Sequence, residues 1–381
     1  MRTGSFRLFA ASAVLLLPAT VRAQGALSTL GFGYPAGQLS TRALGTGGAL
    51  GEIDPLSVSN PAAIVNVGGS VLYFQAEPEY RTLHAGSQSE KATIARYPLV
   101  VAAIPVSPTI VLGLSVSNLL DRSFETTSRG RQQVGDSSLA TSNSFKSDGA
   151  IADLRLALAW TPLAWLHVGA GAHAITGDNR IRNTQVFDDS TRFARLVDTA
   201  TVGYTGRAYS AGFEVLAGKA FSFAGSYRKG GPLSLTRGDT TIANAHVPDR
   251  LALGAAFLGI KGTTIAVRSA KDSWSRMQAL GSPNLRITDS WDTSAGVDVL
   301  GPRLGENIIQ LRAGGRWRTL PFGLPTSSVS EKSLSFGAGT YLARGRASLD
   351  VAGIRATRTA ATTANLSESA WTLSVGITVR P

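Results

Sequence analysis

Residues 371–380 read WTLSVGITVR, and they alternate completely between two faces. One face carries the large apolar residues Trp371, Leu373, Val375, Ile377 and Val379. The opposite face carries small or polar residues and one arginine. A period of two residues is that of a β-strand, because successive side chains of a strand point to opposite faces. The stretch therefore predicts a strand with one wholly apolar face.

The same alternation explains the most apolar internal segment, LRLALAWTPLAWLHVGAGAHAI at 154–175. Arg155, Pro162, His167 and His173 interrupt it, so a membrane-spanning helix is not expected. Two alternating strands joined by a short turn account for it better. Further alternating segments occur around 221–228, 250–257, 308–318 and 333–339.

A soluble β-sandwich also alternates, with its polar face toward water. Three features favour a membrane barrel instead. The face opposite the apolar one is rich in glycine, aromatic residues lie near strand ends (Trp160, Trp317 and Trp371), and the segments have about the length that crosses a bilayer. We therefore expect an all-β fold: a transmembrane antiparallel β-barrel of about 14 strands over 68–381. The polar stretches 124–148 and 177–200 are expected to be extracellular loops.

The first 23 residues predict export. Arg2 and Arg7 precede a short apolar run at 8–17, and small or aliphatic residues occupy the −3 and −1 positions before Gln24. This pattern is typical of a secretory signal peptide, here 1–23, and places the mature barrel in the outer membrane. The chain contains no cysteine, which excludes a lipoprotein anchor, a disulfide framework and a thiolate metal site.

The formal net charge is +12, but the basic residues are scattered rather than clustered, so nucleic acid is not an expected partner. Several of them take the polar face of a strand and are candidates to line the lumen. These candidates are Arg155, Arg228, Arg250, Arg268, Arg312, Arg316, His167 and His173. An arginine-lined interior suits a substrate with a carboxylate head and an apolar tail. Alternatively, these arginines pair with acids such as Asp153, Glu214, Asp298 and Asp350 and stabilise the barrel.

The sequence indicates no catalytic, metal or cofactor site. His167 and His173 lie on one strand face, but six residues at about 3.4 Å each put them roughly 20 Å apart, too far to share an ion. A hydrolase would need a serine, a histidine and a polar orienting group in contact, and no motif in the sequence indicates such a site. The glycines of TRALGTGGALGEIDPLSVSNPAAI at 41–64 do not follow the dinucleotide-binding spacing, and no strand precedes them.

Residues 24–67 lack the strand pattern and are rich in small residues, so they are expected to plug the lumen. Their motifs resemble the N-terminal signature of the outer-membrane superfamily that contains FadL-type hydrophobic-compound transporters and PorV/PorQ-type proteins. The matching residues are Arg42-Ala43-Leu44-Gly45, Gly47-Gly48-Ala49, Asp54 and Asn60-Pro61-Ala62. The segments 246–257, 269–277, 308–322 and 335–353 resemble late strands of that superfamily.

This resemblance implies a 14-stranded barrel whose N-terminal hatch contains Gly45, Gly47, Gly48, Asn60, Pro61 and Ala62. Pro61 fixes its own φ and restricts Asn60, and the Asn60 side chain can bond backbone groups inside the lumen. A structural turn without substrate contact is the alternative for this motif. In the transporter branch, a hydrophobic substrate enters from outside and leaves after the hatch moves.

The leading hypothesis is passive uptake of a hydrophobic or amphipathic, fatty-acid-like small molecule by a monomeric barrel that contacts outer-membrane lipid and lipopolysaccharide. The alternative is a PorV/PorQ-like structural or shuttle component that serves secreted proteins. A third possibility is a purely structural barrel. An apolar pocket beside the hatch, with a lateral or axial exit, would distinguish a transporter from the other two.

Overall fold

The computed structural model describes residues 22–24, 26–85, 88–134, 137–189, 191–281, 285–305, 307–324, 327–360 and 366–381. Most of the predicted signal peptide, 1–21, lies outside these residues. Within them, no helix is long and apolar enough to cross a membrane.

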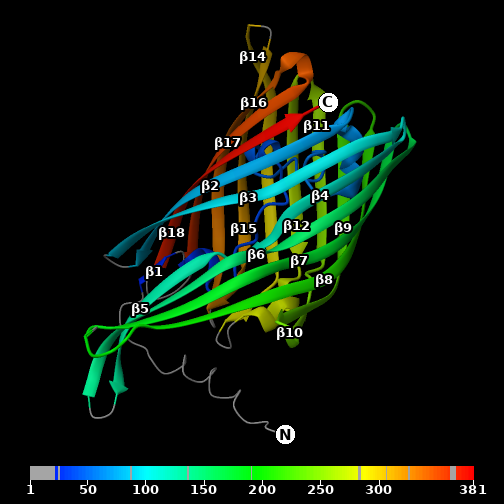
Figure 1. Cartoon of the computed structure of the whole chain (residues 1–381). Coiled ribbons are helices and arrows are strands. Elements are labelled where there is room, and N and C mark those ends of the chain that lie inside the picture. Colours follow the sequence, from blue (N-terminus) through cyan, green and yellow to red (C-terminus); the bar gives the residue numbers. More distant parts are fainter. Residues whose placement is uncertain are drawn as a thin grey trace.

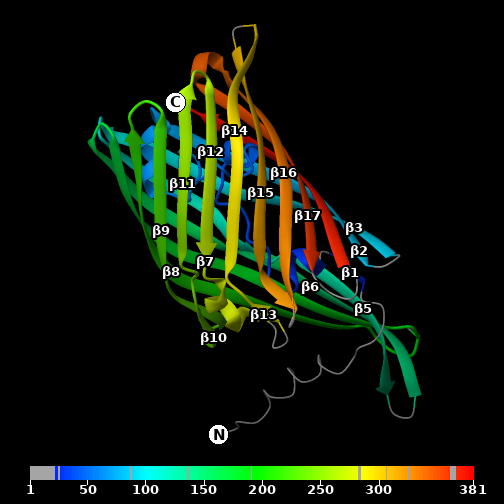
Figure 2. The same ribbon diagram turned by 180° about the vertical axis from the view of Figure 1, so that it is seen from behind.

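The described residues form one closed antiparallel barrel (Figures 1 and 2). Its wall consists of fourteen strands, and β18 pairs with β2 to close it. The wall strands are β2 (Val71–Ala85), β3 (Gln88–Ser107), β4 (Ile110–Asp121), β6 (Ser137–Leu163), β7 (Leu166–Phe187), β8 (Leu196–Ala217), β9 (Phe221–Arg237), β11 (Arg250–Ile260), β12 (Thr263–Asp272), β14 (Ser290–Leu304), β15 (Asn307–Leu324), β16 (Ser327–Leu342), β17 (Ala347–Ala360) and β18 (Leu366–Val379). The prediction of an all-β barrel with about 14 strands is confirmed.

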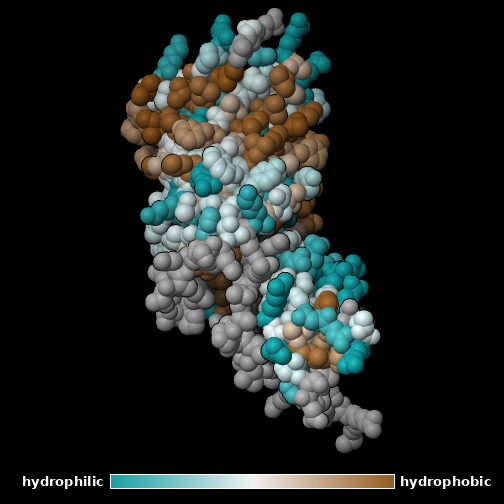
Figure 3. All heavy atoms as spheres, turned by 90° about the vertical axis from the view of Figure 1, so that its left-hand side faces the viewer, coloured by the Kyte–Doolittle hydropathy of each residue, from teal (hydrophilic) through white to brown (hydrophobic). Residues whose placement is uncertain are grey.

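The alternation places the apolar face outward. In β6, Leu154, Leu156, Leu158 and Trp160 are exposed, whereas the residues between them, from Asp153 to Ala159, are buried. This pattern is the inverse of a soluble sandwich and fits a wall that faces lipid. Figure 3 shows the result as an apolar band around the upper part of the barrel, with a paler, more polar surface below it.

The two ends of the barrel differ. At one end, which we call the short-turn end, tight connections such as 164–165, 218–220 and 261–262 join the strands, and the C-terminus lies there (Figure 1). At the other, the hairpin end, long hairpins extend beyond the apolar band. In bacterial barrels the short turns face the periplasm and the longer connections face outward.

The expectation of loops at 124–148 and 177–200 is wrong for most of these residues. β5 (Phe124–Val134) continues the line of β4 and pairs with β6, and β7 and β8 run on to Phe187 and from Leu196. Beyond the membrane both faces of a hairpin meet water, so the strands lose the apolar alternation that reveals them elsewhere. β10 (Thr240–His246) and β13 (Arg286–Ile287) likewise extend the wall, as partners of β9 and β15.

The N-terminal segment occupies the lumen. After β1 (Arg22–Gln24) come α1 (Ala26–Thr29), α2 (Thr41–Gly45) and the 3-10 helix η1 (Pro61–Val67), and the chain then enters the wall at β2. Two other 3-10 helices connect strands: η2 (Trp274–Leu280) at the hairpin end and η3 (Ala343–Gly345) at the short-turn end. We call residues 26–67 the hatch.

A buried apolar cluster fills the hairpin end of the lumen, and we call it the hairpin-end cluster. The hatch contributes Leu27 and Phe32, and η2 contributes Trp274 and Met277. Phe32 packs edge-on against Trp274, with ring centroids 6.2 Å apart. The wall supplies the remaining members, including Leu119, Leu120, Ile151, Ile175, Leu233, Leu320 and Phe322.

Candidate functional site

The glycine run of the hatch forms a helix end and a tight turn. Ser40 caps α2, because its hydroxyl accepts a hydrogen bond from the Ala43 amide at 3.1 Å. Gly47 and Gly48 both have positive φ, a conformation that residues with a Cβ rarely adopt. Gly47 lies so close to the backbone of Gly315 on β15 that a Cβ would meet it at 2.8 Å. The glycines are therefore explained by local backbone geometry and close packing.

The Asn60-Pro61-Ala62 motif docks the hatch on the wall. The Asn60 amide donates to the carbonyl of Glu52 at 2.9 Å and to that of Phe213 on β8 at 3.0 Å. Its oxygen accepts from the Ala62 amide at 3.0 Å, so Asn60 also caps η1, where Pro61 takes the first position. Asn60 is completely buried. One side chain thus satisfies three backbone groups, two of them within the hatch and one on the barrel.

Two glycines of the wall lie directly beneath this motif. A Cβ on Gly212 of β8 would collide with the Asn60 oxygen, and one on Gly169 of β7 would lie 2.5 Å from the Ala62 nitrogen. The small-residue face seen in the sequence is in part the surface on which the hatch rests.

Glu52 is a second anchor, which the sequence did not single out. Its carboxylate accepts hydrogen bonds from Arg268 at 3.0 Å and from Ser226 at 2.6 Å, and it is completely buried. These partners lie on β12 and β9, so Glu52 ties the hatch to a different part of the wall from Asn60. The acid lies within a turn-rich segment, and no local pattern distinguishes it from a solvated glutamate.

A third anchor ties α2 to β2 and β18. The Thr41 amide donates to the Tyr73 hydroxyl at 2.9 Å, and the Thr41 hydroxyl lies 2.8 Å from that of Ser374. Beside it, Arg42 forms a salt bridge of 3.1 Å with Asp298 of β14. Burial alone would lower the pKa of Arg42, but the carboxylates of Asp54 and Asp298 raise it overall. The hatch is therefore held by several sides of the barrel at once.

The structure places all eight candidate lumen residues, from Arg155 to Arg316, on the inner side of the wall. Five of the six arginines form salt bridges with acids: Arg312 with Asp298 and Asp350, Arg316 with Asp292, Arg268 with Asp292 and Glu52, Arg250 with Asp272, and Arg228 with Asp153 and Asp272. Arg155 donates to the hatch carbonyl of Val58 at 2.7 Å. Pairing with acids, the alternative raised for these arginines, thus accounts for most of them.

The two histidines lie in separate networks. His167 lies 3.2 Å from Glu214, which also accepts from Asn66 of the hatch at 2.7 Å. His173 lies 2.7 Å from Asp153 and 2.8 Å from the Ser210 hydroxyl. A serine, a histidine and an aspartate are therefore in contact, as hydrolysis would require. However, Ser210 borders none of the cavities described below, and its neighbours are wall residues in regular β-structure.

Tyr34 of the hatch lies in a cage of charged groups midway along the lumen, and we call this the Tyr34 cage. Four guanidinium groups lie 4.7–5.5 Å from its ring centroid, namely those of Arg81, Arg96, Arg318 and Arg358. Its hydroxyl donates to Glu331 at 3.0 Å and accepts from Arg358 at 2.9 Å. Burial raises the pKa of Tyr34, so the hydroxyl keeps its proton. The sequence did not suggest a role for this tyrosine.

The wall parts into a seam beside this cage. β3 pairs with β4 only from Leu99 to Ser107. Farther toward the hairpin end, β3 pairs only with β2 and β5 pairs with β6, and the described residues of β3 and β5 do not pair with each other. Figure 1 shows β3 and β5 separating toward that end. The hatch lies in the seam, because Tyr34 forms a β-bridge with Asp121, and Arg96 forms a salt bridge with the same aspartate.

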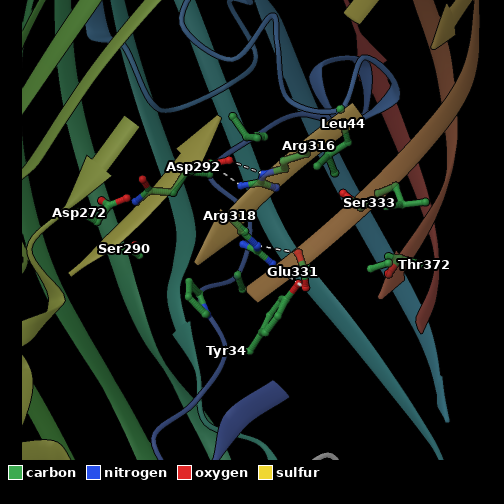
Figure 4. Close-up of a pocket in the computed structure, with 18 of the residues that line it drawn as sticks. Tyr34, Leu44, Asp272, Ser290, Asp292, Arg316, Arg318, Glu331, Ser333 and Thr372 are labelled. Carbon is green, nitrogen blue, oxygen red and sulfur yellow. Dashed lines mark hydrogen bonds and ion pairs between the residues drawn. The ribbon is translucent and has the colours of Figure 1, made fainter. Parts of the chain in front are cut away.

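Three cavities that the structure describes border the hatch, and one of them, of about 200 Å³, lies between Arg42, Ile260 and Asp298. Another, of about 110 Å³, lies between hatch residues 34–39 and the wall, and we call it the arginine cavity. Figure 4 shows Asp292 and Arg316 on one side of it and Tyr34, Arg318 and Glu331 on another. The third, of about 280 Å³, lies at the short-turn end, where Arg42, Asp54, Arg312, Asp350 and Arg380 line it.

Comparison with known proteins finds no matching family model and no matching curated protein. Solved structures do match. A FadL homologue from Pseudomonas aeruginosa superposes with a TM-score of 0.64 at 12% identity, covering 91% of this chain and 99% of that one. The toluene transporter TodX of Pseudomonas putida gives 0.57 at 13%, covering 92% and 98%.

The monoaromatic hydrocarbon channel CymD gives a TM-score of 0.53 at 14% identity, covering 90% of this chain and 97% of that one. At such identities the likeness concerns the fold, which extends over nearly the whole length of each protein. The chain therefore has the fold of the FadL-type outer-membrane channels, a 14-stranded antiparallel barrel with an N-terminal hatch.

Proposed function

We propose that the protein is an outer-membrane channel for passive uptake of hydrophobic or amphipathic small molecules. The observation that carries this proposal is the hairpin-end cluster. Its apolar side chains lie inside the barrel at the end that extends beyond the apolar outer band, so the apolar surface there faces the lumen. A route by which an apolar solute leaves water needs such an interior surface.

The seam between β3 and β5 supports the same proposal. It lies beside the Tyr34 cage, and the N-terminal segment occupies it: β1 pairs with β5 there, and Tyr34 of the hatch forms a β-bridge with Asp121. Movement of the hatch would therefore open the lumen to the side as well as along the axis. The resemblance in fold to channels described as carrying toluene and monoaromatic hydrocarbons favours apolar solutes of that size.

Uptake by a deletion strain tests the proposal. Cells that lack the gene are complemented with wild type, with Asn60→Ala or with the control Asn183→Ala, which changes an exposed asparagine of β7. Labelled toluene and a long-chain fatty acid serve as substrates, and blots check that outer-membrane levels are equal. We expect deletion to abolish uptake of at least one substrate, and Asn60→Ala to alter its rate where Asn183→Ala does not. Uptake that is unchanged by deletion would refute the channel for these substrates.

A role in protein secretion or surface assembly is the second candidate. The β5–β6 hairpin favours it, because this hairpin projects well beyond the barrel (Figure 1) and offers an exposed surface to a partner. Removing residues 126–145 would leave the hatch and the lumen in place. Loss of a secreted protein from the cell surface in that variant, with uptake retained, would favour this second role.

A further inference from the structure

The outer surface of β15 to β18, four neighbouring strands of the wall, changes from polar to apolar along its length (Figures 1 and 2). On β16 the outward-facing Ser328 and Ser330 lie toward the hairpin end, and Lys332 follows them. The next two outward residues, Leu334 and Phe336, are 62% and 68% exposed. In a transmembrane barrel, such a change marks the level at which lipid headgroups meet acyl chains. Lys332 therefore lies at the outer edge of the apolar band.

A second cation, Arg355 of β17, lies beside Lys332 at this level. Arg355 is directly opposite Leu334, and Lys332 is directly opposite Thr357. The two cations are therefore diagonal neighbours on the outer face, and such neighbours lie about 7–8 Å apart, within reach of long side chains. Both are exposed. A single anion in front of the pair would contact both.

No carboxylate offsets this pair on the outer face. The described residues of the four strands include three acids, all of them buried on the inner face: Glu331, Asp350 and Glu368. Elsewhere on the outer surface the balance differs, since Lys229 of β9 forms a salt bridge of 3.1 Å with Asp249. Adjacent like charges on a sheet are destabilising unless an opposite charge compensates them. The compensating anion for Lys332 and Arg355 therefore has to come from outside the chain.

Two tryptophans border the cation pair. Trp317 of β15 lies directly opposite Lys332, and Trp371 of β18 lies directly opposite Arg355. The Arg355 guanidinium is 5.3 Å from the centroid of the Trp371 ring, a cation–π contact that holds it at this level. Aromatic girdles of this kind mark the two membrane interfaces of outer-membrane barrels. The pair is thus placed where lipid phosphates lie.

The short-turn side of the cation pair offers an apolar surface. Leu334 lies opposite Gly315 of β15, and Phe336 lies opposite Gly353 of β17. Because glycines carry no side chain, Leu334 and Phe336 stand out from their neighbours. A Cβ on Gly353 would meet nothing within 4 Å, so the space beside Phe336 is open. Acyl chains can lie there in contact with both apolar side chains.

We propose that the outer face of β15 to β18 binds a phosphorylated glycolipid of the outer leaflet, with a phosphate between Lys332 and Arg355 and acyl chains beside Leu334. Ammonium and guanidinium groups bind phosphate oxygens through charge-assisted hydrogen bonds. Basic clusters at a membrane surface attract anionic headgroups in the same way. The site lies outside the barrel, so this inference is independent of the uptake proposed for the lumen.

Native mass spectrometry of the purified full-length protein in non-ionic detergent tests the site. The lipid probes are diphosphoryl lipid A, monophosphoryl lipid A and phosphatidylcholine, and inorganic phosphate is added as a competitor. The variant Lys332→Gln/Arg355→Gln removes both cations, whereas Lys332→Arg/Arg355→Lys keeps them. The control Arg129→Gln/Arg192→Gln removes two exposed cations from the hairpins beyond the apolar band. The faster gel mobility of unheated samples checks that each barrel is folded.

We expect wild type and the control to bind diphosphoryl lipid A about tenfold or more tightly than Lys332→Gln/Arg355→Gln does, a difference of about 1.4 kcal/mol. The variant that keeps both cations should bind like wild type. Wild type should also prefer the diphosphoryl form to the monophosphoryl form, and this preference should shrink when the cations are removed. Phosphatidylcholine, whose headgroup has no net charge, should bind all four proteins equally.

Equal binding of diphosphoryl lipid A by wild type and Lys332→Gln/Arg355→Gln would overturn the proposal. An equal loss of binding in the control would overturn it too, because net charge rather than this site would then govern the affinity. Displacement of the lipid by inorganic phosphate would show that the cation pair takes a free anion, against the assignment to a lipid.

Discussion

At the scale of single residues, Asn60 has a specific task, because its amide bonds two backbone carbonyls and its oxygen accepts from one amide. Asn60→Ala leaves these buried groups without partners, at a cost of about 1–3 kcal/mol. We therefore expect amide hydrogen exchange across 60–67 to accelerate roughly tenfold or more, since 1.4 kcal/mol corresponds to a factor of about ten. The barrel strands should keep their protection, and Asn183→Ala should exchange like wild type. Unchanged exchange at 60–67 would mean that Asn60 does not hold the hatch.

Ser210 offers a second test at this scale. It contacts His173, which contacts Asp153, but regular wall structure surrounds the group and none of the described cavities reaches Ser210. We therefore expect a fluorophosphonate probe to leave the folded protein unlabelled, under conditions in which a serine hydrolase in the same detergent reacts fully. Labelling that disappears in Ser210→Ala would instead identify a nucleophile.

The sequence suggested a role for a residue only where a local motif or the strand periodicity marked it. Asn60 and Pro61 form a local motif, and lumen-facing residues such as Arg312 follow from strand periodicity. Tyr34 and Glu52 have no such signal, because their partners come from strands more than forty positions away in the chain. Their roles depend on how the hatch folds within the barrel, which neither periodicity nor spacing encodes.

At the scale of elements, the fit of the hatch to the wall depends on missing side chains. Gly212→Ala would place a methyl group against the Asn60 oxygen, and overpacking of this kind costs about 1–3 kcal/mol. We expect the hatch to be displaced part of the time, so that the variant shows more frequent conductance steps than wild type in planar bilayers. Gly353→Ala on β17, where a Cβ would meet nothing within 4 Å, is the matched control. Equal conductance in both variants would contradict tight docking at β8.

Periodicity predicted the strands well only where the barrel faces lipid. Strands such as β6 and β18 alternate there between an apolar outer face and a small or polar inner face, and the count of fourteen followed. The same rule failed at 124–148, because β5 and the first half of β6 stand in water on both sides. The alternation of apolar and polar residues was therefore absent there, although these strands pair through the same backbone hydrogen bonds as the strands that face lipid.

At the scale of the whole molecule, the lumen is layered along its axis. The hairpin-end cluster is apolar, the Tyr34 cage and arginine cavity are charged, and the hatch motifs and their anchors follow toward the short-turn end. A purely apolar solute would meet the charged layer after the hairpin-end cluster. An amphiphile would instead find apolar contacts in the cluster and polar contacts in the charged layer. In this closed arrangement the anchors at Thr41, Glu52 and Asn60 hold the hatch across the axis, so the proposed uptake depends on whether the hatch can leave them.

A disulfide staple tests that dependence directly, because the chain has no cysteine of its own. The hydroxyls of Thr41 and Ser374 are 2.8 Å apart, so cysteines at these positions place two sulfur atoms close to the bonding distance of about 2.05 Å. The pair Ser330→Cys and Thr359→Cys is the control, since these hydroxyls lie 3.2 Å apart and the staple joins β16 to β17 without touching the hatch.

Both staples should form in the oxidising periplasm. We expect the Thr41→Cys/Ser374→Cys protein to lose most uptake of the substrate that wild type carries, because α2 can no longer leave β18. Reduction with dithiothreitol should restore uptake within the same preparation, and the control staple should have little effect in either state. If the oxidised Thr41→Cys/Ser374→Cys protein transports the substrate at the wild-type rate, the hatch does not have to leave β18. The route would then run through the seam beside Tyr34, which the same experiment with a staple at that end of the hatch would examine.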